Sequence, residues 1–513
     1  MKLYNTLSGK LETFHSSNDV VKMYVCGVTP YSQSHVGHVL RAVVFDVLRR
    51  YLEFKGFLVK HVENFTDIDD KMIQRAESTG VSTNKLADDN INIYLSEIKE
   101  MNILPAHVYP RATQEIPKII EMIEGLIGKG FAYCIEGNVY FRVRKDEDYG
   151  KLGRRSLDTM IAGSRVEIDE NKEDVMDFAL WKCEKPGEPS WDSPWGYGRP
   201  GWHIECSAMA LSHLGFPIDI HGGGQDLVFP HHENEIAQSE SYVGSEPMSR
   251  YWLHNGLVRL GSGKMSKSDG NLVTVKDALQ NHSADELRLF FLSAHYRSPL
   301  SYTEEGVSTQ TRAVERLRNA VRSTSPGGSS YTVQIGDFKK RFISAMDDDL
   351  NTPRALAVLF ELSRHINKGI ENGYNVVQIQ DTLQGLCNVL GLTLAEPIFN
   401  REPEFFPLIN LLVDTNAELR SRGREDLSGN MYEQLRVSGI SIEEILGVGG
   451  QAPKSLDGFS SSDADKIITI LVELRDIIRS EGLYELSDSI RERFGDLGFI
   501  LEDSSTGTKW KRS

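Results

Sequence analysis

Near the N-terminus, short apolar runs flank a segment whose apolar positions follow a helical repeat. Residues 22–28, Lys-Met-Tyr-Val-Cys-Gly-Val, form a predicted buried strand. From Val39 to Leu52 the apolar positions recur at helical spacing, which predicts an amphipathic helix that ends near Gly56. Residues 58–65 predict a second strand. This order predicts the start of a parallel α/β sheet, in which ligands gather at the carboxyl ends of the strands.

The rest of the chain departs from this alternation in two places. Residues from about 104 to 200 mix helical and strand patterns with a Pro-, Gly- and Trp-rich segment, which indicates an insertion. The sheet pattern resumes at residues 217–221, followed by a predicted glycine turn at 222–224 and a helix that starts at Pro230. After about residue 302 the pattern is helical throughout. The predicted domains are an α/β domain over residues 1–301, a helical domain over 302–448 and a small unit over 464–513.

Length and composition restrict the class of protein. A chain of 513 residues with 40% hydrophobic residues is long enough for several domains, because single cores stop growing at about 250 to 300 residues. Five scattered cysteines indicate reduced thiols, so any cysteine function would be metal binding or catalysis. No signal or transit pattern opens the chain, and no apolar run reaches the roughly 18 residues that a bilayer span needs. We therefore expect a soluble, cytoplasmic protein with no membrane partner.

The net charge of −16 argues weakly against a nucleic-acid partner, because phosphate contacts need Lys and Arg. Net charge does not describe local patches, however, and one predicted helix carries four arginines against a single glutamate, Glu315. Such a stripe is most often a solvated helix face, and its alternative role is binding of RNA phosphates. Its members are Arg312, Arg316, Arg318 and Arg322.

The sequence His35-Val36-Gly37-His38 falls at the start of the first predicted helix. Its histidines are three residues apart, so one helical turn puts both on the same face, and the glycine lets a nucleotide approach the backbone closely. A helix N-terminus adds amide donors and partial positive charge that suit phosphate oxygens. Alone the motif is weak, because paired surface histidines are common.

A second phosphate-handling motif, Lys264-Met265-Ser266-Lys267-Ser268, lies far downstream between glycines. Two lysines on a glycine-hinged loop can close on a triphosphate and neutralise the charge that develops on leaving pyrophosphate. The serines offer hydroxyl donors. The alternative is a polar surface loop without function. The lysine motif occurs together with the upstream histidine motif, however, and this favours an ATP site. The two motifs together predict chemistry at the α-phosphate of ATP.

Cysteines, histidines and a glutamate form a candidate metal site. His231 and Glu235 share a helix face at i, i+4 spacing, although His232 with Glu235 is a competing pair. Cys206 and Cys26 could add two thiolates, because strand ends and helix starts converge in α/β folds. Cys, Cys, His and Glu form a zinc-type ligand set. Taken singly, Cys26 is more often an inert buried cysteine, but it lies only nine residues before the ATP motif.

These motifs together resemble one family closely, the cysteinyl-tRNA synthetases, which are class I aminoacyl-tRNA synthetases. The resemblance covers nearly the whole chain, and Val36 replaces the isoleucine usual in the family's His-Ile-Gly-His signature. Besides the two ATP motifs and the tail at 501–510, it rests on Tyr24-Val-Cys-Gly-Val-Thr-Pro-Tyr31, Asn64-Phe-Thr-Asp-Ile-Asp-Asp-Lys71, Gly201-Trp-His-Ile-Glu-Cys206, His221-Gly-Gly-Gly-Gln-Asp226 and Phe229-Pro-His-His-Glu-Asn-Glu235.

The resemblance implies the roles of the three domains and of the metal. The first would be a Rossmann-type parallel-sheet catalytic domain, the second a tRNA-binding helical bundle and the third an anticodon-binding unit. One zinc ion per chain would bind the substrate thiolate, which zinc prefers to the neutral hydroxyl of serine. The implied zinc ligands are Cys26, Cys206, His231 and Glu235, so that His232 is excluded. The implied lining of the amino-acid pocket is Thr66, Trp202 and Asp226.

The implied reaction begins with attack of the cysteine carboxylate on the α-phosphate of ATP, which gives cysteinyl-adenylate and pyrophosphate. Cysteine then passes to the terminal ribose of tRNA(Cys). His35 and His38 would hold the phosphates, and Lys264 and Lys267 would stabilise the transition state, with Mg²⁺ accompanying ATP. The other implied ATP-binding residues are Gly37, Met265, Ser266 and Ser268.

Two other functions fit parts of the sequence. A ligase that joins cysteine to an amino sugar in thiol biosynthesis shares the ATP and zinc motifs. Such ligases lack a full anticodon-binding end, whereas this chain keeps more than 200 residues beyond Ser301. A non-catalytic, zinc-stabilised RNA-binding paralogue would need no mobile phosphate loop at 264–268. We therefore expect a monomeric ligase that acts on L-cysteine, ATP and tRNA(Cys).

Overall fold

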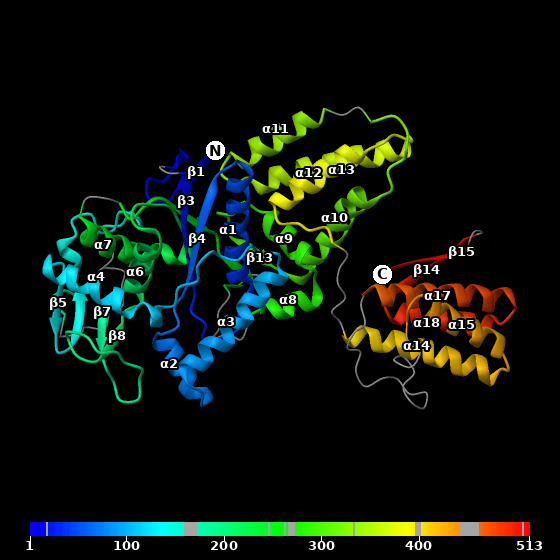
Figure 1. Cartoon of the computed structure of the whole chain (residues 1–513), viewed down its shortest axis with the longest axis horizontal. Helices are drawn as coiled ribbons and strands as arrows, with labels where there is room; N and C mark the ends of the chain where they lie inside the picture. Colours follow the sequence, from blue (N-terminus) through cyan, green and yellow to red (C-terminus); the bar gives the residue numbers. More distant parts are fainter. Residues whose placement is uncertain are drawn as a thin grey trace. The chain divides into compact units, whose positions relative to one another are not determined.

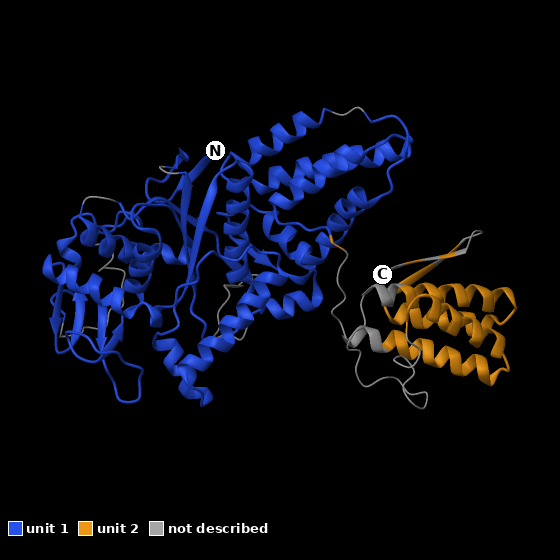
Figure 2. Ribbon diagram, in the orientation of Figure 1, with its two compact units in different colours: residues 1–394 blue, residues 395–513 orange. Residues whose placement is uncertain are grey.

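The computed structural model of the chain divides into two compact units, residues 1–394 and residues 395–513 (Figure 2). Each unit contains its own hydrophobic core. The structure describes residues 1–16, 19–157, 172–244, 247–260, 263–264, 272–331, 334–395, 402–440, 461–504 and 507–512.

A parallel four-stranded sheet in the order β10-β9-β3-β4 forms the centre of the first unit, with α1 beside it (Figure 1). The predicted first strand, helix and second strand are confirmed as β3, α1 and β4. The helix starts three residues earlier than its apolar repeat, because Val36, Gly37 and His38 of the histidine motif form its first turn. The bounds are β3 Val20–Val28, α1 Val36–Phe54, β4 Leu58–Phe65, β9 Ile218–Gly224 and β10 Ser249–Asn255.

The direction of the strand connections changes at β3. β3 pairs with β4 on one side and with β9 on the other. The chain reaches β4 directly through α1, but it reaches β9 only after the long segment that follows β4. Connections that leave a strand in opposite directions open a crevice between them, which is where ligands bind in open α/β sheets.

The segment between β4 and β9 contains the predicted insertion at about 104–200. It includes an antiparallel sheet in the order β5-β6-β7-β8, and α4 packs beside α6 (Figure 1). The apolar faces of these elements form a separate core around Ile119, Val139 and Trp181. The bounds are α2 Asp70–Thr79, α3 Thr83–Glu100, α4 Ile116–Gly128, β5 Ala132–Ile135, β6 Asn138–Phe141, β7 Phe178–Cys183, β8 Gly198–Pro200 and α6 Trp202–Leu214.

The predicted glycine turn at 222–224 is wrong, because these residues continue β9 and pair with Leu253–Asn255 of β10. The glycines serve close packing instead of a turn: a β-carbon at Gly222 would lie 2.1 Å from the ring of Phe45 on α1. The helix predicted to start at Pro230 is α7 (Glu233–Val243), and it follows a π-helical turn at Val228–His232 that is kinked at Phe229, where the backbone is extended.

The end of the first unit is helical, as predicted, and its helices share the core of the central sheet. On α10 the side chains of Arg312, Arg316 and Arg322 are exposed, whereas Arg318 is half-buried. A small sheet in the order β12-β11-β13 precedes these helices. The bounds are β1 Lys2–Asn5, β2 Lys10–Thr13, β11 Val258–Leu260, β12 Gly263–Lys264, α8 Val275–Asn281, α9 Ala284–Leu292, β13 Leu300–Tyr302, α10 Glu304–Arg322, α11 Ile335–Met346, α12 Thr352–Glu371 and α13 Val377–Val389.

In the described part of the second unit, four helices and a hairpin pack around one core. Residues 402–440 therefore share a core with residues 461–501, whereas α10–α13 share one with the central sheet. The functional boundaries at 302 and 464 stay predictions. None of the described helices is long and apolar enough to cross a bilayer. The bounds are α14 Glu402–Ser421, α15 Glu425–Val437, α17 Ser461–Ser480, α18 Tyr484–Asp496, β14 Phe499–Ser504 and β15 Gly507–Arg512.

Candidate active site

His35 and His38 form a fixed pair at the N-terminus of α1. His35 is the N-cap residue: its Nδ1 accepts a hydrogen bond from the Gly37 amide (3.1 Å), and its own amide donates to Nδ1 of His38 (3.3 Å). The two imidazole rings stack with their centroids 3.7 Å apart. Burial lowers the pKa of His38 well below its usual value, and the neighbouring His35 and Arg41 add to this effect. The pair stands at a helix terminus, which attracts phosphate.

The segment that follows the predicted phosphate loop pairs with this helix start. The amide of Val36 donates to the carbonyl of Val273 (3.1 Å), and the amide of Val275 donates to the carbonyl of Ser34 (3.0 Å). The described chain resumes at residue 272, four positions after Ser268, and the bonds of Val273 and Val275 place it beside the histidine motif. The structure describes the backbone of Lys264 in β12. The side chain of Lys264, together with Met265, Ser266, Lys267 and Ser268, lies outside the described residues.

Four buried side chains converge at the carboxyl end of β3 as a candidate metal site. Their ligand atoms all lie within 4.8 Å of one another. β3 contributes Cys26, α6 contributes Cys206, the π-helical turn contributes His231, and α7 contributes Glu235. The sequence separations are large, yet the strand order and the packing of α6 on α7 bring the four together.

The distances in this cluster fit a zinc-type ion. The sulfurs of Cys26 and Cys206 are 3.8 Å apart, and two thiolates on a tetrahedral zinc with bonds of about 2.3 Å stand about 3.8 Å apart. Nε2 of His231 lies 3.0 Å from Oε1 of Glu235, and Oε1 lies 3.4 Å from the Cys26 sulfur. Oε2 of Glu235 is buried and makes no hydrogen bond among the described residues, although Nε2 of His221 lies 3.4 Å from it. A cation would satisfy this oxygen.

The protonation of the cluster depends on burial and on the thiol pair. A hydrogen bond from Cys26 lowers the pKa of the Cys206 thiol to about 7. Burial raises the pKa of Cys26 and also holds the pKa of Glu235 well above its usual value. A metal ion would reverse the effect of burial, because it stabilises the ionised thiolate and carboxylate.

A second set of ligands overlaps the first. It joins Cys26 and Glu235 to His221 and His232, whose Nε2 atoms lie 3.7 Å and 3.3 Å from the Cys26 sulfur. Nδ1 of His232 is 2.8 Å from Nε2 of His254. The competition between His231 and His232 that spacing leaves open is therefore present in the fold as well.

Hydrogen bonding gives the two candidate histidines equivalent surroundings. Nδ1 of His231 lies 2.9 Å from Nδ1 of His203, which leaves Nε2 of His231 directed at Glu235. Such a partner on the second ring nitrogen is typical of a metal-binding imidazole, and His254 is the equivalent partner of His232, so the choice between the two stays open. Sequence reasoning did not assign a role to His203, His221 or His254. The first two lie inside segments that carry the family resemblance, which is the signal that could have found them, whereas His254 ends a strand without any motif.

The three predicted pocket residues differ in their surroundings. Trp202 is half-exposed and stacks on the ring of His231, with centroids 4.2 Å apart. Thr66 is buried just beyond β4, where its hydroxyl accepts a hydrogen bond from Asn64 (3.4 Å). Asp226 is exposed in a short helical turn, and within the described part of the chain no hydrogen bond or ion pair joins it to the other two. The fold thus brings Trp202 to the candidate metal site and Thr66 to the neighbouring strand end.

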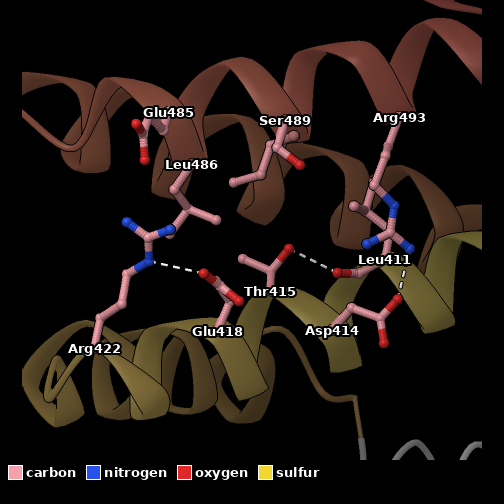
Figure 3. Close-up of a pocket in the computed structure, with 10 residues that line it drawn as sticks. Leu411, Asp414, Thr415, Glu418, Arg422, Glu485, Leu486, Ser489 and Arg493 are labelled. Atoms are coloured by element: carbon pink, nitrogen blue, oxygen red, sulfur yellow. Dashed lines mark hydrogen bonds and ion pairs between the residues drawn. The ribbon is translucent and has the colours of Figure 1, made fainter.

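A cavity of about 230 Å³ lies in the second unit, between α14 and α18 (Figure 3). Two ion pairs lie in its lining: Arg422 donates to Glu418 (2.8 Å) and Arg493 donates to Asp414 (2.7 Å). None of the predicted ATP, metal or amino-acid residues lines it. The cavity is therefore separate from the candidate active site.

Known proteins with the same domain and fold define the class. Residues 12–312 match the tRNA synthetases class I (C) catalytic domain, and residues 341–395 match the DALR domain. The structure is similar to methionyl-tRNA synthetase of Mycobacterium tuberculosis bound by methionyl-adenylate, with a TM-score of 0.54 and 16% identity over 76% of this chain and 94% of that chain. It is also similar to the LeuRS-tRNA-LeuAMS ternary complex of Agrobacterium radiobacter K84, with a TM-score of 0.53 and 11% identity over 74% of this chain and 84% of that chain. Fold and domain content together define a class I tRNA synthetase.

Sequence similarity identifies the family within this class. A cysteine–tRNA ligase of Dehalococcoides mccartyi is 53% identical over 87% of this chain and 98% of its own length. The cysteine–tRNA ligase of Aquifex aeolicus is 43% identical over 100% of this chain and 99% of its own length. That of Thermotoga maritima is 42% identical over 99% of both. The chain belongs to the cysteine–tRNA ligase family.

Proposed function

We propose that this chain activates L-cysteine with ATP and transfers it to tRNA(Cys). The observation that carries the proposal is the cluster of two thiols, an imidazole and a carboxylate at the end of β3, immediately before the helix that begins with the ATP motif. Relatives that are cysteine–tRNA ligases align over the whole chain, including α10–α13 and the second unit. The amino-sugar ligase and the non-catalytic RNA-binding protein are therefore not favoured.

Two displacement steps make up the reaction. A carboxylate oxygen of cysteine attacks the α-phosphorus of ATP, the bond to the β-phosphate breaks, and pyrophosphate leaves with its electron pair. A hydroxyl of the terminal ribose of the tRNA then attacks the carbonyl carbon of cysteinyl-adenylate, and AMP leaves. No side-chain nucleophile is needed. His35 and His38 would hold the phosphates at the N-terminus of α1, while Lys264 and Lys267 would neutralise the charge on pyrophosphate, accompanied by Mg²⁺.

The metal cluster would select the substrate. Cys26, Cys206, His231 and Glu235 would hold one zinc ion, which, when bound, supplies a preference for thiolate over a neutral hydroxyl. Trp202, stacked on His231, would form one wall of the amino-acid pocket, with Thr66 and Asp226 as further contacts.

The choice between the two candidate histidines has its own experiment. His231→Gln should lower the zinc content of the purified protein below one ion per chain, whereas His232→Gln should keep the ion. The opposite result would support the ligand set with His221 and His232.

The remaining surfaces would serve the tRNA. The exposed arginines of α10, Arg312, Arg316 and Arg322, present positive charge that suits phosphate oxygens. Half-buried Arg318 would support this surface. The second unit would bind the anticodon end. We expect the protein to act as a cytoplasmic monomer.

One pair of assays tests the function: ATP–pyrophosphate exchange that depends on cysteine, followed by aminoacylation of tRNA(Cys). Loss of exchange in the wild-type chain would exclude both enzyme functions, and exchange without charging would favour the amino-sugar ligase. Lys267→Ala should slow exchange by about 100- to 1,000-fold, the usual effect of removing a group that stabilises transition-state charge. Lys276→Ala, at an exposed position of α8, is the matched control and should leave the rate unchanged.

A further inference from the structure

The buried guanidinium of Arg41 fastens α1 to the carboxyl end of β3. Its Nη1 donates to the carbonyl oxygens of Cys26 and Gly27, the latter at 2.6 Å. Its Nη2 donates to Oε1 of Glu63 (2.8 Å) and to the hydroxyl of Tyr94 (3.2 Å). Two successive carbonyl groups of β3 are therefore held by one side chain of the helix that carries the ATP motif.

Glu63 and Tyr94 complete this buried network. The Tyr94 hydroxyl donates to the same carboxylate oxygen that Arg41 contacts (2.6 Å), and all three side chains are buried. A buried ion pair is weak evidence for stability, because apolar residues of similar volume often stabilise a core equally well. What apolar residues cannot do is hold backbone carbonyls in a fixed direction, as the planar fork of a guanidinium does.

Hydrogen bonds connect the end of β3, to which Arg41 donates, with Thr66 of the predicted amino-acid pocket. The amide of Gly27 donates to Oδ1 of Asn64 (2.9 Å), and Nδ2 of Asn64 donates to the hydroxyl of Thr66 (3.4 Å). A β-carbon at Gly27 would lie 1.5 Å from the carbonyl oxygen of Asn64, so the two backbones approach as closely as only glycine allows. A continuous chain of contacts thus runs from α1 through β3 to Thr66.

We propose that Arg41 is a positioning residue for cysteine activation: it sets the position of the Cys26 thiol relative to the ATP motif. Arg41 lies three residues after His38, and residues at this spacing share a helix face. Cysteine is a short substrate, so its carboxylate reaches the α-phosphate only if the thiol-binding and phosphate-binding groups keep a fixed separation. A displacement of about 1 Å can slow a reaction by about 100-fold. This inference rests on the proposed function.

Arg41→Lys tests the positioning role because lysine keeps the charge beside Glu63 but cannot reach two carbonyls and a carboxylate from one planar group. We expect kcat/KM for cysteine in ATP–pyrophosphate exchange to fall by about tenfold to 100-fold, the usual loss for a charge-assisted hydrogen bond. The KM for cysteine should rise more than the KM for ATP. With Co²⁺ in place of zinc, the visible absorption spectrum of Arg41→Lys should differ from that of the wild type, because the backbone carbonyl of Cys26 has lost its hydrogen bond from Arg41.

Tyr94→Phe is the milder variant and decides the question if Arg41→Lys does not fold. It removes the hydroxyl that bridges to Glu63 and leaves the donors to β3 in place. A smaller rise in the KM for cysteine, in the same direction, is expected. An unchanged KM together with an unchanged Co²⁺ spectrum in this variant would overturn the proposal when Arg41→Lys cannot be measured.

Arg50→Lys is the matched control on the same helix. Arg50 pairs with Asp46 (2.9 Å) and donates to the carbonyl of Asn102 (2.8 Å), so it also joins α1 to a backbone carbonyl, but away from β3. It should lower Tm and leave both the KM for cysteine and the Co²⁺ spectrum unchanged. If Arg41→Lys behaves in the same way, Arg41 only stabilises the fold. A wild-type chain without exchange would overturn the proposed function, whereas an active wild type and an equally active Arg41→Lys would overturn only the positioning role.

Discussion

The buried histidine His61 gives the first unit a stability that depends on pH in a measurable way. It lies on β4, and within the described residues neither of its ring nitrogens has a hydrogen-bond partner. Burial, assisted by the charge of Arg49, lowers the pKa of His61 to about 3. In the unfolded chain a histidine has a pKa of about 6.5. Between these values the unfolded state binds a proton that the folded state does not, so the free energy of unfolding falls as the pH falls.

The size of this effect follows from the two pKa values. From pH 7.5 to pH 5.5, proton binding by His61 in the unfolded chain lowers the free energy of unfolding by RT ln(11/1.1), or about 1.4 kcal/mol. His61→Leu removes the titrating ring at similar volume. Over this pH interval the free energy of unfolding of the variant should therefore fall by about 1.4 kcal/mol less than that of the wild type. At pH 7.5 the variant should be at least as stable as the wild type, because it no longer buries two unpaired ring nitrogens.

Urea titrations at the two pH values, followed by tryptophan fluorescence, measure the difference. Five of the six tryptophans belong to the first unit, so the signal reports mainly on its unfolding. His15→Leu, at an exposed position of the same unit, is the control and should follow the wild type. Equal losses of unfolding free energy in His61→Leu and the wild type would refute the reasoning, because the ring would then bind its proton equally well in both states.

Three further predictions concern the metal centre and the packing of the first unit. Cys206→Ser should lower the zinc content below one ion per chain and reduce the preference for cysteine over serine in ATP–pyrophosphate exchange to about 100-fold or less. The control Cys183→Ser should change neither quantity. Unchanged zinc content and unchanged preference in Cys206→Ser would contradict the ligand assignment. Asp46→Asn leaves the buried guanidinium of Arg288 without its ionic partner and should lower the free energy of unfolding by about 3 to 5 kcal/mol in urea titrations. A decrease below about 1 kcal/mol would show that the pair is not tightly buried. Gly222→Ala introduces a β-carbon 2.1 Å from an aromatic ring of α1 and should destabilise the fold by about 1 to 3 kcal/mol, and an unchanged Tm would argue against this close approach.

The local pattern of the sequence was sufficient for three elements at the site, β3, α1 and β4. The apolar repeat predicts α1, and the short apolar runs predict β3 and β4, because which face of an element is buried depends on positions within a few residues of one another. The chemistry of the candidate residues is also local information. A thiol, an imidazole and a carboxylate are ligand types wherever they lie, and the i, i+4 spacing of His231 and Glu235 already predicts their contact.

Only the tertiary structure decided what these elements pack against. Cys26 meets Cys206 and Glu235 across 180 and 209 residues of chain, because β3 lies between β4 and β9 and α6 packs on α7. The same packing adds His221 and His232 as competing ligands. It also makes 222–224 a strand, since the glycines let β9 approach α1. Helical periodicity likewise could not tell which helices share a core, because an apolar stripe shows that a face is covered but not which partner covers it.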